Sequence, residues 1–223
     1  MASCISPGKD CDLCPRLAGF RVANRKQFPG MFNAPVPAFG DADPLLLIVG
    51  LAPGLRGANF TGRPFTGDYA GDTLYPMLAE YGFAKGDYNK HINDGLALID
   101  ARITNAVRCV PPENKPGGEE INNCRPFLES ELTSLKRLKV IIALGTVAHN
   151  SILRAVGLPV AGYKFGHNVK HILKPKKALG HTVTLLDSYH CSRYNVNTGR
   201  LTEKMFADVI RTARDEARKG KAA

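Results

Sequence analysis

The chain has 223 residues, of which 44% are hydrophobic and 22% charged, and this composition excludes a predominantly disordered protein. Lys and Arg exceed Asp and Glu by 30 to 20, and the excess is one-sided: the counts are 11 against 10 up to Pro111, and 19 against 10 after it. Such an asymmetry favours a polyanionic partner such as nucleic acid or an anionic membrane surface, although a solvated basic face kept for solubility gives the same counts.

No part of the sequence predicts a membrane segment or a leader. The longest strongly apolar run, residues 45–51, is far below the ~20 residues that span a bilayer, and the first 15 residues lack the apolar core of a signal peptide. We therefore expect a cytoplasmic protein. In that reducing compartment, six cysteines are better suited to binding metal or filling the core than to forming disulfides.

Short apolar runs alternate with helical patterns along the chain. An arm rich in proline and glycine, residues 1–43, comes first; the predicted strands are residues 45–49, 102–107, 140–144 and 182–186, and the predicted helices are residues 72–81, 119–138, 146–156 and 202–218. This order predicts an α/β fold: a single domain over residues 1–223 with a mainly parallel four-stranded central sheet flanked by helices. Ligands of such sheets bind beyond the carboxyl ends of the strands.

Four cysteines have spacings typical of a metal centre. Cys11 and Cys14 form a C-x₂-C pair, which places two sulfurs on one tight turn, and 14 residues separate Cys109 from Cys124. Four such ligands suit tetrahedral zinc and an iron–sulfur cluster equally, so spacing leaves the metal open. Four unrelated buried thiols remain the alternative, and Cys4 is a rival ligand near Cys11.

A long glycine-rich loop follows the first predicted strand. Its glycines at positions 50, 54, 57, 62 and 67 allow the backbone to approach a ligand closely and to offer N–H donors. The loop matches neither the G-x₄-G-K-[ST] phosphate loop nor the G-x-G-x-x-G turn. Among the glycines, Phe65 and Asp68 are expected to be displayed rather than buried.

Four ordered motifs carry a family resemblance that spans nearly the whole chain. They are G-L-A-P-G at residues 50–54, G-R-P-F-T-G-D at 62–68, I-T-N-A-V-R-C at 103–109, and S-Y-H-C-S-R-Y-N-V-N-T-G-R-L-T at 188–202. In these motifs the chain resembles the uracil-DNA glycosylases, most of all the iron–sulfur-containing family 5, which is sister to family 4. The resemblance implies a base-excision repair enzyme that removes uracil, and other deaminated bases in some members, from DNA. It also implies that the four cysteines hold a [4Fe–4S] cluster rather than zinc.

The resemblance assigns roles to residues in these motifs. Asp68 becomes the carboxylate that orients water and faces the sugar cation, although an aspartate before a helix also serves as its N-cap. Asn105 is suited to read a pyrimidine edge, and His190 to hydrogen-bond O2 of uracil as the base leaves; either side chain could instead be a satisfied buried group. Phe65 is expected to stack on the base, against the alternative of ordinary core packing, and backbone amides near Gly54 to support it.

Two positions depart from the family pattern. Cys191 stands where the family usually has proline after the histidine, which alters the rigidity of that loop. Leu51 and Ala52 stand where other uracil-DNA glycosylases have an acidic or amide residue that activates water. The water-activating role must therefore lie elsewhere.

The polar loop that follows His190 is a candidate DNA contact. Ser192 and Arg193 are placed to grip phosphate, and Arg193 or Tyr194 to fill the gap left by the extruded nucleotide; a plain surface loop is the alternative. We expect a monomer that acts on DNA containing uracil in single or double strands.

Other functional classes make different demands on the chain. A bifunctional glycosylase/lyase needs a nucleophilic lysine, and these motifs contain none. An iron–sulfur redox protein leaves the glycine-rich loop and the histidine motif unexplained. A non-catalytic iron–sulfur nucleic-acid-binding protein fits the charge but has no use for Asp68.

Overall fold

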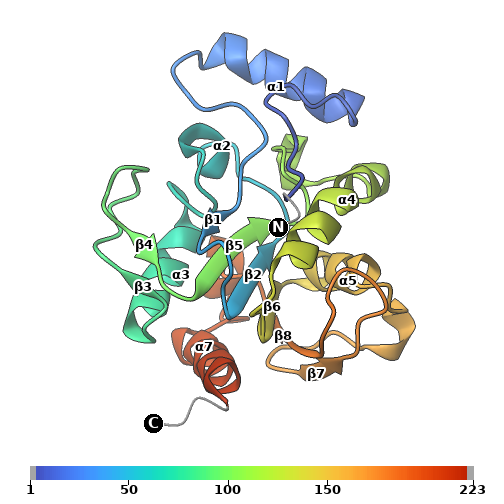
Figure 1. The fold of residues 1–223 in the computed structure, drawn as a ribbon. Coiled ribbons are helices and arrows are strands. Elements are labelled where there is room, and N and C mark those ends of the chain that lie inside the picture. Colours follow the sequence, from blue (N-terminus) through green and yellow to red (C-terminus); the bar gives the residue numbers. More distant parts are fainter. Residues whose placement is uncertain (1–3, 220–223) are drawn as a thin grey trace.

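A computed structural model describes residues 4–219 of the chain. Its centre is a six-stranded sheet in the order β1-β5-β2-β6-β8-β7 (Figure 1). The strands are β1 (Phe39–Gly40), β2 (Leu46–Gly50), β5 (Ala101–Asn105), β6 (Val140–Leu144), β7 (Lys170–Leu173) and β8 (Val183–Ser188). The four inner strands, β5, β2, β6 and β8, are parallel to one another. At the two edges, β1 pairs antiparallel with β5, and β7 pairs antiparallel with β8.

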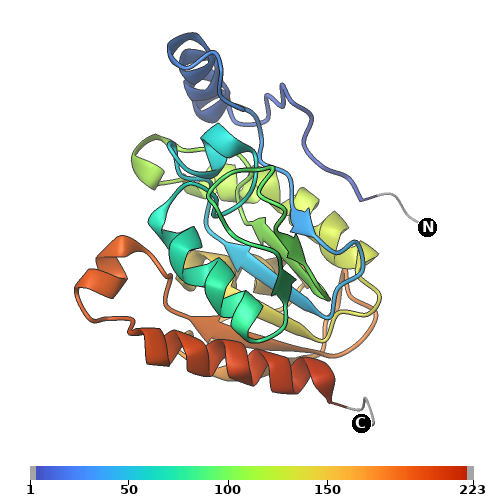
Figure 2. The ribbon, with the colours of Figure 1, turned by 90° about the vertical axis from the view of Figure 1, so that its left-hand side faces the viewer.

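Helices cover both faces of the sheet. Helices α3 (Tyr69–Glu80) and α7 (Glu203–Arg218) pack together on one face, and α4 (Gly118–Ser134) and α5 (Thr146–Ala155) on the other (Figures 1 and 2). Alternate residues of β2 therefore enter different cores: Leu46 and Ile48 face α3 and α7, while Leu47 and Val49 face α4 and α5. Burial on both faces is the reason that the inner strands read as continuous apolar runs.

The predicted α/β fold is confirmed, and its four predicted strands are the four parallel inner strands. The sequence analysis does not predict the edge strands, because β1 has two residues and β7 exposes Lys170 and Ile172 instead of forming an apolar run. Helix α1 (Pro15–Gln27) in the N-terminal arm is also unpredicted: its buried side chains include Arg21 and Asn24, so it has no apolar stripe. The predicted helix over residues 119–138 ends earlier, at Ser134.

Smaller elements occur between the main strands and helices along the chain. They are α2 (Ala58–Thr61), the hairpin of β3 (Ala84–Lys85) with β4 (Ala97–Leu98), and α6 (Arg193–Asn197). Figure 2 shows α6 projecting from the molecule beside the N-terminal end of α7. None of the helices in residues 4–219 combines the length and apolar character needed to span a bilayer.

Candidate active site

A cavity of about 420 Å³ opens at the carboxyl ends of β2, β5 and β8. The predicted site residues that line it come from four separate parts of the chain: Gly54, Phe65, Asp68, Asn105, His190, Ser192 and Arg193. The parallel sheet brings these segments to one edge. These residues lie beyond the carboxyl ends of the strands, which is where ligands of parallel sheets bind.

Asn105 lies at the last position of β5, directly opposite Gly50 of β2. A Cβ atom at Gly50 would overlap the Asn105 Oδ1 atom and lie 2.7 Å from Cζ of Phe65, so only glycine allows this close approach. The Asn105 side chain is 3% exposed, and its Oδ1 has no hydrogen-bond partner in the described part of the chain. A buried carbonyl oxygen without a partner is costly unless a ligand satisfies it.

Phe65 is buried rather than displayed, which corrects the expectation from its glycine-rich neighbourhood. The side chain is 6% exposed, and its ring stacks on the ring of His190 with 5.9 Å between centroids and 30° between planes. Its backbone has φ of +53°, a left-handed conformation that residues other than glycine rarely adopt. The ring therefore packs in the core while one part of it lines the cavity.

His190 follows the end of β8 and is held by its own backbone. The Asn195 side chain donates to the His190 carbonyl over 2.8 Å. Burial lowers the pKa of His190 to about 4, so the imidazole is neutral at physiological pH. A neutral ring offers one N–H donor to a ligand.

Asp68 caps a helix and lines the cavity at the same time. Its Oδ1 accepts from the backbone N–H of Gly71 over 3.2 Å at the start of α3, and its Oδ2 faces Gly54 and Gly57. Burial raises the pKa of this carboxyl, although the hydrogen bond from Gly71 opposes the shift. The two readings of Asp68 from the sequence are therefore compatible.

The segment after His190 forms a short helix, α6, where the sequence analysis expects a loop. Ser192 is its N-cap and accepts from the Asn195 N–H over 3.4 Å, which satisfies one amide of the first turn. The Arg193 guanidinium lies 5.5 Å from the centre of the Tyr69 ring, and both line the cavity. Tyr194 does not line the cavity; its side chain is 71% exposed.

Tyr69 and Asn114 also line the cavity, although they were not predicted from the sequence. Tyr69 directly follows Asp68 in the motif, and that adjacency is the one available signal. Asn114 lies in an irregular segment after β5, with φ of +57°, and no pattern in the sequence indicates it. Among the described residues that line the cavity there is no lysine.

A second cavity gathers the four predicted metal ligands. Cys11, Cys14, Cys109 and Cys124 all line it, although they come from the arm, the segment after β5 and helix α4. Cys4 is exposed and does not line this cavity. The structure therefore distinguishes the four cysteines from their rival.

Hydrogen-bond donors surround these sulfurs. The Arg108 N–H donates to Sγ of Cys124 over 3.3 Å, and the Arg21 guanidinium donates to Sγ of Cys109 over 3.5 Å. Burial raises the pKa of the free thiols of Cys109 to about 11 and of Cys124 to about 12. Buried sulfurs that receive N–H donors suit thiolates whose charge a metal neutralises.

Two histidines and an aspartate form a further group of metal-type ligands. Ligand atoms of His149, His171 and Asp187 lie within 4.8 Å of one another. His149 Nδ1 is 2.7 Å from Asp187 Oδ1, and its Nε2 is 3.0 Å from the carbonyl oxygen of Tyr163. Both ring nitrogens thus face oxygen acceptors at hydrogen-bond distance, which fits a protonated imidazole paired with a carboxylate.

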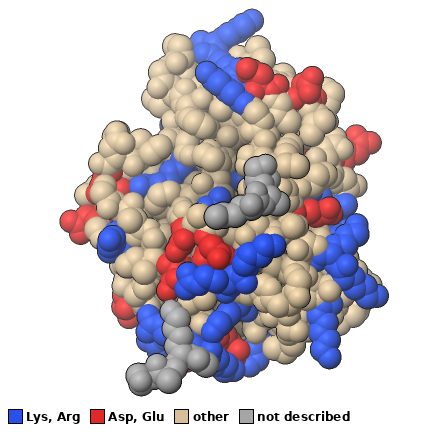
Figure 3. Space-filling model, in the orientation of Figure 1, with Lys and Arg blue, Asp and Glu red and all other residues tan. Residues whose placement is uncertain are grey.

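Basic side chains gather on particular parts of the surface. In Figure 3 they lie along the lower right margin, over the region of β7, and at the top over α1. Among the described residues that line the first cavity, Arg193 is the only Lys or Arg, so most basic side chains of the second half of the chain lie elsewhere.

Comparison with known proteins supports the resemblance predicted from the motifs. The family model of the Uracil DNA glycosylase superfamily matches residues 37–214. The chain is 42% identical over 209 residues to a type-5 uracil-DNA glycosylase of Thermus thermophilus, with 92% of each chain covered, and 37% identical over 212 residues to one of Pyrobaculum aerophilum, with 93% of this chain and 89% of the relative covered. A type-4 uracil-DNA glycosylase of Pyrobaculum aerophilum is 35% identical over 150 residues, with 67% of this chain and 62% of the relative covered.

Proposed function

Because the chain belongs to the uracil DNA glycosylase superfamily, we propose that it hydrolyses the N-glycosidic bond of uracil in DNA as a monofunctional glycosylase. The observation that carries the proposal is the buried Oδ1 of Asn105, which has no hydrogen-bond partner among residues 4–219 and lies in a cavity shared with Phe65, Asp68 and His190. This atom accepts from N3–H of uracil, and the amide Nδ2 donates to O4. Cytosine presents the reverse pattern, so the same side chain selects against it.

The remaining cavity residues divide the chemistry between base and sugar. Phe65 stacks on the extruded base, and the neutral imidazole of His190 donates to O2, where negative charge develops as the bond breaks. Asp68 uses its Oδ2 to orient the attacking water and to stabilise the sugar cation, while its Oδ1 stays with the helix. Glycines 54 and 57 leave the space that this carboxylate faces.

The four cysteines at the second cavity fit a [4Fe–4S] cluster. Cys11, Cys14, Cys109 and Cys124 supply four sulfurs from three segments, and the surrounding N–H groups suit thiolate ligands. When bound, the cluster supplies a cross-link between the arm, the segment after β5 and helix α4. We assign it no part in the hydrolysis.

The direct test is release of free uracil from a uracil-containing oligonucleotide by the cluster-loaded protein. We expect release from uracil substrates, with thymine- and hypoxanthine-containing oligonucleotides run beside them to define the base range. The strand should break only after alkali or heat, because the described residues that line the cavity include no lysine for a lyase step. Strand scission without alkali would indicate a lyase. Binding of DNA without release of any base would support a non-catalytic nucleic-acid-binding protein instead.

A further inference from the structure

The backbone of the glycine-rich loop is unusual on both sides of Thr66. Phe65 has φ of +53° and Gly67 has φ of +86°, so two left-handed residues lie within three positions. Glycine adopts this conformation freely, but phenylalanine adopts it only where its surroundings impose it. Something must therefore hold Phe65, the residue proposed to stack on the base.

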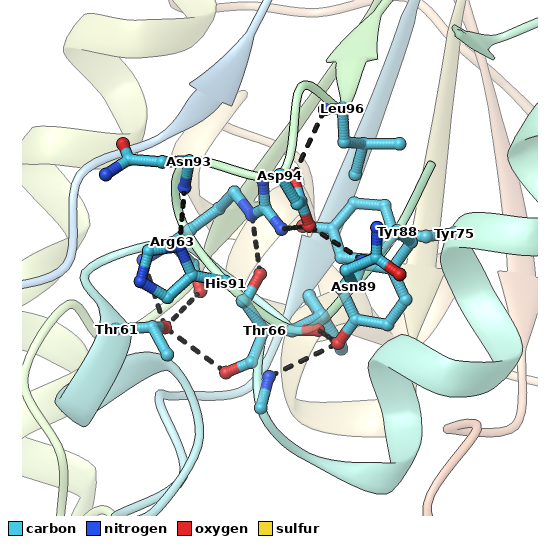
Figure 4. A network of polar contacts seen from close by, with 12 residues as sticks. Thr61, Arg63, Thr66, Tyr75, Tyr88, Asn89, His91, Asn93, Asp94 and Leu96 are labelled. Atoms are coloured by element: carbon cyan, nitrogen blue, oxygen red, sulfur yellow. Dashed lines mark hydrogen bonds and ion pairs between the residues drawn. The ribbon is translucent and has the colours of Figure 1, made fainter. Parts of the chain in front are cut away.

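The hydroxyl of Tyr88 bridges these two residues (Figure 4). It donates to the carbonyl oxygen of Phe65 over 3.2 Å and accepts from the backbone N–H of Gly67 over 3.2 Å. Burial raises the pKa of Tyr88 to about 12, so the hydroxyl keeps the proton that it donates. The start of α3 closes on the same contact, because a Cβ atom at Gly71 would overlap both the Phe65 carbonyl and the Tyr88 hydroxyl.

Tyr88 is itself fixed by a buried ion pair. Both oxygens of Asp94 bind the Arg63 guanidinium, over 2.8 and 2.7 Å, and they also accept from the backbone N–H groups of Leu96 and Asn89 (Figure 4). Both side chains of this pair are almost completely buried. The carboxylate thereby shapes the segment between β3 and β4 that carries Tyr88.

Arg63 connects this segment to the glycine-rich loop. It precedes Phe65 by two residues, its Nε donates to the Thr66 hydroxyl over 2.7 Å, and its guanidinium lies 5.8 Å from the centre of the Tyr88 ring. The side chain therefore contacts both Tyr88 and Thr66, the residue between Phe65 and Gly67. Tyr88 does not line the cavity, so any effect on the substrate must pass through the loop.

We propose that Tyr88 is a positioning residue, whose hydroxyl holds Phe65 in the left-handed conformation that directs its ring into the base-binding cavity. The proposal rests on the proposed function for the stacking role of Phe65. It assigns to the β3–β4 segment a part in base binding that none of the four family motifs contains. Without the hydroxyl, the Phe65 carbonyl and the Gly67 amide lose their common partner, and the ring samples positions that stack poorly.

The test begins with Tyr88→Phe, which removes the hydroxyl and keeps the ring. We expect the single-turnover rate on uracil-containing single-stranded DNA to fall by about tenfold or more, since small displacements of binding groups are costly to catalysis. Tyr81→Phe is the matched control: this tyrosine follows the far end of α3, roughly 18 Å along the helix from Asp68, and its rate should be unchanged. Rates are measured well below the melting temperature of every variant, so that loss of folded protein does not contribute.

A double-mutant cycle separates positioning from a purely structural role. If Tyr88 acts through Phe65, then Tyr88→Phe should cost little more in a Phe65→Ala background, because the ring to be positioned is already absent. Losses that multiply independently would overturn the proposal, as would an unchanged rate for Tyr88→Phe alone.

Hydrogen exchange provides a readout that does not depend on activity. Peptides covering residues 65–71 should exchange several-fold faster in Tyr88→Phe than in the unchanged chain or in Tyr81→Phe, because the Gly67 amide loses its acceptor. Equal exchange would refute the bridge whatever the substrate. A failure of the unchanged chain to release uracil would instead contradict the proposed function, so the two failures are distinguishable.

Discussion

Asp68 combines two tasks because its two carboxylate oxygens face different ways. One oxygen caps α3 through Gly71, and the other faces Gly57 and Gly54, of which Gly54 lines the cavity. The neighbouring acidic residue of the first turn, Asp72, does not line the cavity and pairs with Lys90 instead. The helix therefore presents one catalytic candidate and one natural control four residues apart.

We expect Asp68→Asn to reduce the single-turnover rate by at least about 100-fold while leaving DNA affinity nearly unchanged, because the lost interaction acts mainly in the transition state. Asparagine still caps the helix, so the fold should persist. Rapid-quench kinetics and equilibrium binding measure the two effects. Asp72→Asn should retain the rate; a fall for Asp72→Asn with a near-normal Asp68→Asn would show that the other carboxylate acts.

The rate should depend on the ionisation of Asp68, and His190 should cause no change in rate near neutral pH. The rate should rise with pH through the pKa of Asp68, which burial raises above its usual 3.8, because the ionised form is needed. Burial lowers the pKa of His190 to about 4, so its ring is already neutral near pH 6.5, where histidine usually titrates. A single-turnover profile of the unchanged chain should show no limb near pH 6.5. In Asp68→Asn the limb of Asp68 should disappear, and any acid limb that remains should lie near pH 4, where His190 gains its proton. A limb near pH 6.5 that survives in Asp68→Asn would contradict a neutral His190.

At the scale of elements, α6 places two neighbouring side chains in different settings. Arg193 rests on the Tyr69 ring and lines the cavity, whereas Tyr194 projects into solvent. The N-cap at Ser192 fixes the start of the helix directly after His190. The exposed ring is thus the better placed of the two to enter a base stack, and the arginine to contact phosphate.

We expect Tyr194→Ala to slow cleavage of uracil in duplex DNA several-fold more than cleavage in single strands. A base in a duplex reacts only after leaving the stack, and a ring that fills the vacancy offsets part of that cost. Tyr194→Phe, which keeps the ring, should behave as the unchanged chain. The comparison is made at one salt concentration, since phosphate contacts are salt-dependent. Equal losses on both substrates would remove the wedge role from Tyr194.

At the scale of the whole molecule, the second cavity joins segments that the sheet alone does not hold together. The arm with α1 contributes Cys11 and Cys14, and the opposite wall comes from Cys109 and Cys124. The apolar contacts there are few, with Leu17 and Val107 as their buried centre. A bound cluster would therefore contribute directly to the stability of this end of the molecule.

The chain purified under anaerobic conditions should carry about four irons and be brown. Cys11→Ala should lose iron and melt at a lower temperature, because one ligand of the cross-link is gone. Cys4→Ala, which changes an exposed thiol outside the cavity, should keep both. Iron analysis with visible absorption and thermal melting give the answer. Zinc in place of iron, or equal iron content in both variants, would contradict the assignment.

The parallel inner sheet, the family and the list of candidate residues could all be predicted from the amino-acid sequence. It could do so because strands buried on both faces leave continuous apolar runs, and because Phe65, Asp68, Asn105 and His190 lie in contiguous motifs. These patterns involve residues that are close together in the chain, so they can be recognised in the sequence alone.

How those residues are arranged around one cavity depends on the folded chain. The edge strands, α1 with its buried Arg21, and the bridge from Tyr88 to Phe65 depend on partners far away in the chain, and no local pattern encodes them. The glycines around Phe65 predict an exposed side chain, but packing against His190 buries its ring. Pairing between β2 and β5 sets Gly50 beside Asn105, whose amide oxygen has no partner in the described part of the chain, and only the folded chain brings this pairing about.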